Sequence, residues 1–258
     1  MTTIYQHFRP EEKSFIDQVL NWKSQVEQSY APKLTDFLDP REQEILKTVI
    51  GKNHDVQWQL FGGAHYSERK RALLYPDYFE AEKDDFQLTL FQVVYPHKFV
   101  KIEHPQVLGS LMSLGLKRNK FGDILFREEE IQFIVSKEIA DYLCVQLESI
   151  GRATVKLVAK GFEEVIETNE QWQDRPITAS SLRLDTILAS VYNLSRQKAQ
   201  AYIQSNLVKV NWTHIENPAF ECREGDIISV RGLGRSKVIS IEGKTKKDNW
   251  KVVIGLQK

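Results

Sequence analysis

Residues 181–205 read SLRLDTILASVYNLSRQKAQAYIQS, and the spacing of their apolar residues predicts two helices separated by a short break. Ser180 or Ser181 can cap the first helix, and Ser195 can cap the second, which is expected over 196–205. The break falls at 193–194. The residues expected to bury one side of each helix are Leu184, Ile187, Leu188 and Val191 in the first, and Ala199, Tyr202 and Ile203 in the second.

This arrangement brings basic side chains to a helix N-terminus, where free N–H groups and a partial positive charge attract anions. Arg196 and Lys198 lie in the first turn of the second helix, and Arg183 can close the site from the first. Asp185 can orient a nearby arginine. An arginine fork suits bidentate phosphate contact and a lysine supplies a point charge, so the stretch predicts a phosphate-binding surface. Two ordinary helices with solvated basic ends are the alternative interpretation.

A basic loop is expected further along the same region. Arg231-Gly232-Leu233-Gly234-Arg235 predicts a flexible loop in which the backbone and two arginines approach a phosphate. A nucleotide-binding glycine loop is a weak alternative, because the third glycine and the following helix are absent. Strands are predicted around it at 207–210, 226–230, 238–241 and 251–254.

Charge is distributed unevenly along a chain that is neutral as a whole. Residues 181–258 contain 13 Lys and Arg against 7 Asp and Glu, a net charge of +6, which leaves −6 for residues 1–180. Such asymmetry favours a nucleic-acid partner for the basic part. The 41% apolar content excludes a disordered chain, and no apolar run is long enough for a membrane span. With neither a signal peptide nor a cysteine framework, a location in the reducing cytoplasm is expected.

The N-terminal part, residues 1–80, predicts a small helical unit with an attached hairpin. Its second helix has the clearest start, since Asp39 can cap it and Glu42 completes a capping box three residues later. Two short strands are expected over 56–61 and 71–75.

Residues 81–165 predict a ferredoxin-like domain with the βαββαβ order that RNA-recognition motifs share. The strand over 130–136 lacks the glycine of an RNA-recognition motif and carries one aromatic residue, Phe133. We therefore expect this domain to serve as a scaffold or to contact protein rather than to stack bases. Its elements are expected at 86–94, 106–116, 123–126, 131–135, 137–150 and 153–159.

The polar residues 166–180 predict a linker, in which Pro176 discourages a continuing helix. The linker would join the middle domain to a C-terminal domain over residues 181–258. The expected class is α+β, with a helical N-terminal unit and hairpin, an RRM-like middle domain and a basic C-terminal domain.

Four spaced motifs resemble the S-four type RNA-binding domain, named after a small-subunit ribosomal protein. They are Arg183-Leu184-Asp185, Leu194-Ser195-Arg196-Gln197-Lys198-Ala199, Val208-Lys209-Val210-Asn211 and Gly225-Asp226-Ile227. With the 231–235 loop and the acidic ferredoxin-like region, the chain further resembles the bacterial YlmH family over nearly its whole length. Two turns depart from the usual pattern, Ser205-Asn206 in place of a glycine and Asn211-Trp212 in place of Asn-Gly.

The resemblance implies an αL-type fold for the C-terminal domain, with the second helix facing structured RNA. For YlmH-like proteins it implies binding to large-subunit ribosomal RNA, where they help to clear stalled nascent chains still attached to tRNA. Peptidyl-tRNA is then a further expected partner, and the chain is expected to act as a monomer. The candidate RNA-binding residues are Ser181, Arg183, Ser195, Arg196, Gln197, Lys198, Arg231 and Arg235.

No catalytic, metal or cofactor site is predicted from the sequence. A pseudouridine synthase needs a catalytic aspartate in an Arg-Leu-Asp segment, and the one present here, 183–185, belongs to the small basic domain. Two alternatives to a non-enzymatic RNA-binding protein stay open. One is an RNA-modifying enzyme with an unrecognised catalytic domain, and the other is a protein-interaction adaptor linked to cell division.

Overall fold

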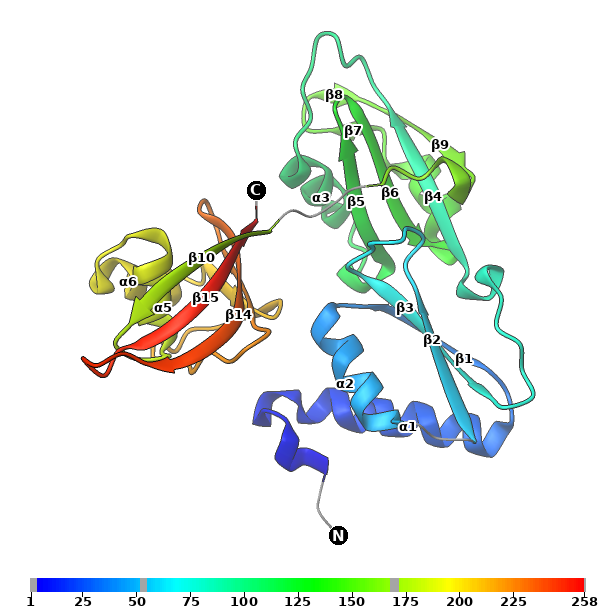
Figure 1. Ribbon diagram of the computed structural model, residues 1–258. Coiled ribbons are helices and arrows are strands. Elements are labelled where there is room, and N and C mark those ends of the chain that lie inside the picture. The colour runs from blue at the N-terminus through cyan, green and yellow to red at the C-terminus, as the bar shows by residue number, and fades with distance from the viewer. Residues whose placement is uncertain (1–3, 52–54, 168–171, 258) are drawn as a thin grey trace. The chain divides into compact units, whose positions relative to one another are not determined.

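The computed structural model of the protein describes residues 4–51, 55–167 and 172–257. The chain folds into two compact units, residues 1–168 and 169–258 (Figure 1). Helices and strands alternate in both units, which confirms the expected α+β class. Within the described ranges, no helix has the length and apolar character that a membrane span requires.

The first 80 residues form two helices that cover one face of a three-stranded antiparallel sheet. The capping box is present, because Asp39 Oδ1 accepts from the Glu42 N–H at 2.9 Å and the Glu42 carboxylate accepts from the Asp39 N–H at 2.8 Å. The expected hairpin is joined by a third strand that the sequence did not predict, and the strand order is β1-β3-β2. The elements are α1 (Lys13–Ser29), β1 (Lys33–Leu38), α2 (Pro40–Ile50), β2 (Val56–Phe61) and β3 (Lys70–Pro76), preceded by 3-10 turns at Ile4–His7 and Pro10–Glu12.

The middle part is ferredoxin-like, as predicted. Its four strands are all antiparallel in the order β5-β6-β4-β9, and two helices pack on one face. The expected helix over 137–150 is shorter, because residues 149–154 form a small hairpin. The elements are β4 (Leu88–Val94), α3 (His104–Ser113), β5 (Phe121–Arg127), β6 (Glu130–Ser136), α4 (Ala140–Gln146), β7 (Ser149–Ile150), β8 (Ala153–Thr154) and β9 (Lys156–Lys160), with 3-10 turns at Lys83–Phe86, Arg118–Lys120, Lys137–Ile139 and Phe162–Glu164.

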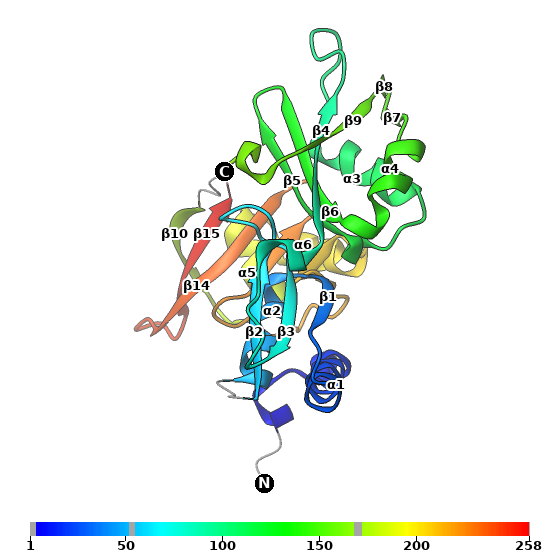
Figure 2. The same ribbon diagram turned by 90° about the vertical axis from the view of Figure 1, so that its right-hand side faces the viewer.

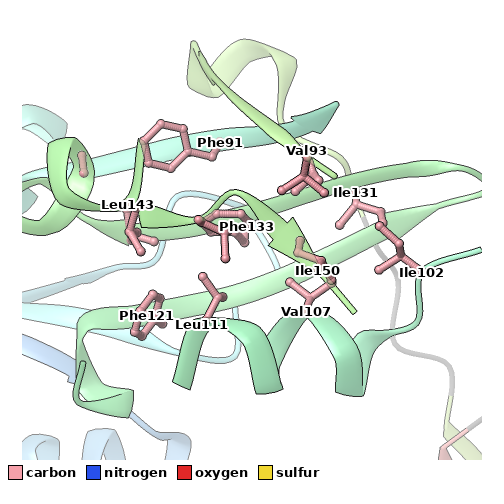
Figure 3. Close-up of a cluster of buried hydrophobic side chains, with 14 of the residues drawn as sticks. Phe91, Val93, Ile102, Val107, Leu111, Phe121, Ile131, Phe133, Leu143 and Ile150 are labelled. Atoms are coloured by element: carbon pink, nitrogen blue, oxygen red, sulfur yellow. The ribbon is translucent and has the colours of Figure 1, made fainter. Parts of the chain in front are cut away.

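Both faces of this sheet are covered within the unit. On the helical face, Phe133 is buried against Phe91 with the ring centroids 5.7 Å apart (Figure 3). On the opposite face, Ile134 packs with Phe37 from β1 and with Ile166. The sheet face on which an RNA-recognition motif stacks bases is therefore filled by side chains of the same chain.

The segment around Ile166, which packs on that second face, is also held to the sheet by hydrogen bonds. The buried Gln132 side chain donates to the Glu164 carbonyl at 3.0 Å and accepts from the Ile166 N–H at 2.8 Å. Ile166 is itself fully buried. The residue that opens the predicted linker is thus part of the core of the first unit.

Residues 169–258 form a six-stranded antiparallel sheet in the order β10-β15-β14-β13-β11-β12, with α5 and α6 packed together. The apolar side chains predicted to line α5 are all buried, as are Ala199 and Ile203 of α6, whereas Tyr202 is half-buried. The elements are β10 (Trp172–Ala179), α5 (Leu184–Tyr192), α6 (Arg196–Gln204), β11 (Val208–Val210), β12 (Thr213–His214), β13 (Ile227–Val230), β14 (Gly234–Lys244) and β15 (Trp250–Gln257).

The prediction of a linker over 166–180 is wrong for most of its length. Residues 168–171 lie outside the described residues, but 172–179 form the edge strand β10, paired with β15 from end to end. Pro176 is tolerated because an edge strand has a side on which no ladder hydrogen bond is needed. The polar composition reflects the exposed positions along β10, and the second compact unit therefore includes this strand rather than beginning at 181.

The basic loop expected over 231–235 is a tight hairpin turn instead. Val230 pairs with Gly234 and Ser229 pairs with Arg235, so Arg235 belongs to strand β14. Gly232 and Gly234 have φ values of 83° and 98°, in the region that favours glycine. The Arg231 side chain is exposed at the turn.

Candidate nucleic-acid interface

The first N–H groups of α5 are not available to bind an anion, because they donate to backbone carbonyls of the same unit. Arg183, rather than Ser180 or Ser181, occupies the N-cap position, which corrects the predicted cap. The N–H groups of Leu184 and Asp185 donate to backbone carbonyls of a later loop, at 2.8 Å and 3.2 Å. Ser181 instead lies 3.0 Å from Thr186, hydroxyl to hydroxyl, so its side chain is engaged inside the unit.

A buried carboxylate joins the two helices. Asp185 is fully buried, and Arg183 donates to both of its oxygens, from Nε at 3.1 Å and from Nη2 at 3.0 Å. Arg196 donates from Nε to Oδ2 at 3.0 Å, and the Gln200 amide donates to the same oxygen at 2.8 Å. Asp185 thus holds one arginine from each helix in a fixed position, as the sequence suggested for one of them.

The protonation of this carboxylate is set by its donors. Burial by itself would raise the pKa of Asp185, but the hydrogen bonds from Arg183, Gln200 and Arg196 outweigh it and hold the pKa well below its usual range. Asp185 therefore stays ionised at neutral pH, and its single negative charge offsets part of the charge of two arginines.

The arginines keep part of their donors for an outside partner. Arg183 is 38% exposed and Arg196 is 56% exposed, although both contact the buried Asp185. Within the described chain, Nη1 of Arg183 and both Nη atoms of Arg196 make no hydrogen bond. Because the guanidinium is planar, fixing one edge also sets the direction of the remaining N–H groups.

The N-terminus of α6, unlike that of α5, is open. Ser195 is the N-cap, as predicted, and its Oγ accepts from the Lys198 N–H at 3.2 Å. In the described residues, the N–H groups of Arg196 and Gln197 have no partner, and the side chains of Ser195 through Lys198 are exposed. A helix end of this kind, with a lysine and two arginines beside it, is suited to bind phosphate.

The turn at 231–235 lies against the corner between α5 and α6. The Tyr192 hydroxyl, at the end of α5, is 3.3 Å from the Gly234 carbonyl and 3.4 Å from the Ser236 hydroxyl. Arg235 lies over the ring of Trp212, 5.6 Å from its centroid. Asn211 and Trp212 form the β11–β12 turn with φ values of 48° and 65°, so a tryptophan occupies a position that suits glycine.

The structure therefore links the predicted residues in two ways. Arg183 and Arg196 share Asp185, while Arg235 is joined to Trp212 and its turn to Tyr192. Sequence reasoning missed the hydrogen bond from Gln200 to Asp185 and the contact of Tyr192. Only the i, i+4 spacing of Arg196 and Gln200 offered a signal, since it places both on one side of α6.

Among residues 4–51, 55–167 and 172–257, no group of three or more His, Cys, Asp or Glu side chains is arranged to hold a metal ion.

Three family models together match most of the chain. They are described as YlmH, N-terminal (residues 11–79), putative RNA-binding domain in YlmH (81–164) and S4 domain (182–228). A relative from Bacillus subtilis (strain 168), named ribosome-associated protein quality control protein P2, is 48% identical over the full length of both chains. The chain belongs to the YlmH family.

A solved structure supports the same membership in the YlmH family. The chain titled cell division protein ylmH from Streptococcus pneumoniae is 39% identical and superposes with a TM-score of 0.55. The similarity covers 64% of this chain and 99% of that chain. The resemblance to the YlmH family is thus confirmed, and the S4 model at 182–228 confirms the resemblance inferred from the motifs at 183–185 and 194–199.

Proposed function

We propose that this YlmH-family chain is a non-enzymatic, monomeric RNA-binding factor of the bacterial cytoplasm that binds ribosomal RNA of the large subunit. It acts on stalled subunits that carry peptidyl-tRNA. The observation that carries the proposal is the Asp185 cluster, which holds Arg183 and Arg196 beside the open N-terminus of α6.

The relatives and the charge distribution support this assignment. The Bacillus subtilis relative, which aligns over the full length of both chains, is named a ribosome-associated protein quality control protein. An S4 domain is matched at 182–228. The region from 181 onward carries a net charge of +6, whereas the rest of the chain carries −6. A basic surface on an otherwise acidic protein is directed towards RNA phosphates.

Fixed arginines make phosphate binding stronger than flexible ones would. A free arginine loses side-chain entropy when it binds, about 0.5–1.5 kcal/mol per immobilised side chain. In this chain Asp185 has already restricted Arg183 and Arg196 in the folded protein. If about five phosphates are neutralised, the affinity should fall by roughly 3.5 to 4.5 decades for each decade of salt.

The cleanest test uses Lys198, because its side chain is exposed and only its backbone N–H serves the fold. Lys198→Glu should remove most co-sedimentation with large subunits on sucrose gradients while leaving the unfolding transition unchanged. Lys251→Glu makes the same charge change at an exposed position of β15 and should retain binding. Arg183→Ala and Arg196→Ala are less informative, because each removes a donor from a buried carboxylate.

The gradients should include vacant large subunits and large subunits loaded with peptidyl-tRNA. Stronger binding to loaded subunits would support action on stalled complexes. If the wild type stays at the top of the gradient with both, the proposal fails. If Lys198→Glu binds normally, the α5–α6 corner is not the RNA contact. Modified nucleosides appearing in RNA incubated with the purified chain would overturn the non-enzymatic assignment.

A further inference from the structure

The loop between β4 and α3 carries the most exposed large apolar side chain of the described residues. Phe99 is 88% exposed, whereas the neighbouring Ile102 is buried in the core of the ferredoxin-like domain. The loop projects beyond the end of the sheet in both views (Figures 1 and 2). An aromatic ring held in water at the tip of such a loop has no role in the packing of this unit.

Hydrogen bonds hold the loop in a defined shape. The N–H groups of Phe99 and Val100 both donate to the Pro96 carbonyl, at 2.9 Å and 3.2 Å. The Tyr95 hydroxyl donates to the Glu129 carbonyl at 3.0 Å, and the His97 ring contacts the Glu129 carboxylate. The loop is therefore attached to the β5–β6 turn at its base, and Phe99 is presented by a constrained backbone.

Two lysines lie close to Phe99 in the sequence of the loop. Lys98 and Lys101 are exposed on either side of it, and no ion pair involves either lysine within the described chain. Lys156, also exposed, lies opposite Val94 on the edge strand β9, where β4 enters the loop. The acidic residue of the loop, Glu103, lies at its far end as the N-cap of α3, and Glu129 of the adjoining β5–β6 turn is contacted by His97.

We propose that this loop is a second RNA-binding site, which takes an unpaired nucleotide of single-stranded RNA. The base stacks on the Phe99 ring, and Lys98 and Lys101 contact the adjoining phosphates. A single ring between two cations suits a nucleotide, because stacking needs one aromatic face and the backbone supplies the negative charge. A protein partner would instead require a contiguous apolar surface around Phe99.

The site differs in kind from the sheet surface of an RNA-recognition motif. That face is covered here by Phe37 and Ile166, which pack on Ile134 of β6, so a nucleotide cannot stack on it. The loop lies in the first compact unit and does not depend on the α5–α6 corner in the second. Two sites on one chain would raise the overall affinity for an RNA that reaches both.

The test measures binding of a fluorescein-labelled 12-nucleotide oligouridylate to the full-length chain by fluorescence anisotropy. Phe99→Ala should weaken binding by about 5-fold or more, because stacking contributes about 1–3 kcal/mol per base. Phe99→Trp should bind at least as tightly as the wild type. Val145→Ala removes an exposed apolar side chain from α4 and should change nothing.

The same variants are then combined with Lys198→Glu, which separates the two sites. The effect of Phe99→Ala should persist in that background, whether or not Lys198→Glu itself alters binding. Replacing the uridines by 4-thiouridine and irradiating the complex should cross-link the RNA to the peptide that contains Phe99. Equal affinities for Phe99→Ala and wild type in both backgrounds would overturn the proposal. So would a loss of co-sedimentation with ribosomal particles in Phe99→Ala without loss of oligouridylate binding, which would identify a protein partner.

Discussion

Arginines are placed in opposite ways in the two units of this protein. In the first unit, Arg69 and Arg71 are buried between the β1–β3 sheet and the ferredoxin-like domain, and their guanidinium groups donate mainly to backbone carbonyls. In the second unit, Arg183 and Arg196 contact a single buried carboxylate and stay partly exposed. The first pair joins two sheets, and the second pair is left with donors for a ligand.

The difference shows that the type of acceptor determines whether an arginine keeps donors for a ligand. Arg71 donates to the Thr35 carbonyl at 2.7 Å and to the Gln87 carbonyl at 3.1 Å, so its donors are consumed by the fold. Arg196 gives one N–H to Asp185 and keeps the rest. A buried carboxylate accepts from several donors at once and can therefore fix two arginines without enclosing them.

Removing a buried arginine should have the largest effect. Arg71→Ala leaves the buried Thr35 carbonyl without this donor, at about 1–3 kcal/mol, and removes one of the two donors to the Gln87 carbonyl, which also accepts from the Lys137 N–H. We expect the first unit to lose about 3 kcal/mol of stability, measured by urea denaturation of the full chain. The matched control is Arg127→Ala, since Arg127 is exposed and, among the residues that the structure describes, pairs with Glu130 at the surface. A similar loss in both variants would contradict the structural role of Arg71.

Changing the shared carboxylate should have a smaller effect on stability and an unusual effect on binding. Asp185→Asn removes the charge-assisted bonds from Arg183 and Arg196, which should destabilise the second unit by about 2 kcal/mol. RNA affinity should also fall, although the protein becomes more positive, because the two arginines lose their fixed positions. Asp174→Asn makes the same charge change at an exposed position of β10. Tighter RNA binding by Asp185→Asn would show that net charge alone governs binding.

A third effect is a dependence of stability on pH that differs between the two units. Burial raises the pKa of Asp123 from 3.8 to about 6, although the backbone N–H groups of Arg69 and Glu68 act to lower it. The folded protein then retains a proton that the unfolded chain has released, so this carboxyl makes the first unit less stable as the pH rises from about 4 to about 6. Asp185 has the opposite sign, because its lowered pKa contributes stability above 3.8 that is lost as the pH falls further.

Urea denaturation at pH 4 and at pH 6.5 measures this difference. In Asp123→Asn, the stability of the first unit should fall less between pH 4 and pH 6.5 than in the wild type. The stability of the second unit should be the same in both proteins. A first unit whose stability changes equally with pH in wild type and Asp123→Asn would refute the assignment.

Much of the candidate interface could be predicted because its signals are local. The apolar stripe of α5, the cap at Ser195 and the basic first turn of α6 all depend on residues within about four positions of one another. The capping box at Asp39 and Glu42 is local in the same sense. Each of these features is present in the structure, with the cap of α5 moved from Ser181 to Arg183.

The errors concern contacts between residues far apart in the chain. The segment 172–179 looks like a linker because its composition is polar, and it becomes a strand only through pairing with 250–257. The role of Gln200 depends on a carboxylate 15 residues earlier. The cover on the ferredoxin-like sheet depends on Phe37, which precedes that sheet by about 50 residues and belongs to an unpredicted strand.

Periodicity, caps and charge along the chain are enough to establish the α+β class, the helices α5 and α6 and a basic surface at Arg196 and Lys198. These properties arise from short-range sterics and from hydrogen bonds within a few residues. The tertiary structure decides which arginines keep donors for a ligand and which face of the ferredoxin-like sheet is closed. It also decides where Phe99 projects. Burial removes water from a polar group, and its partner is then whichever group the tertiary structure brings within hydrogen-bond distance.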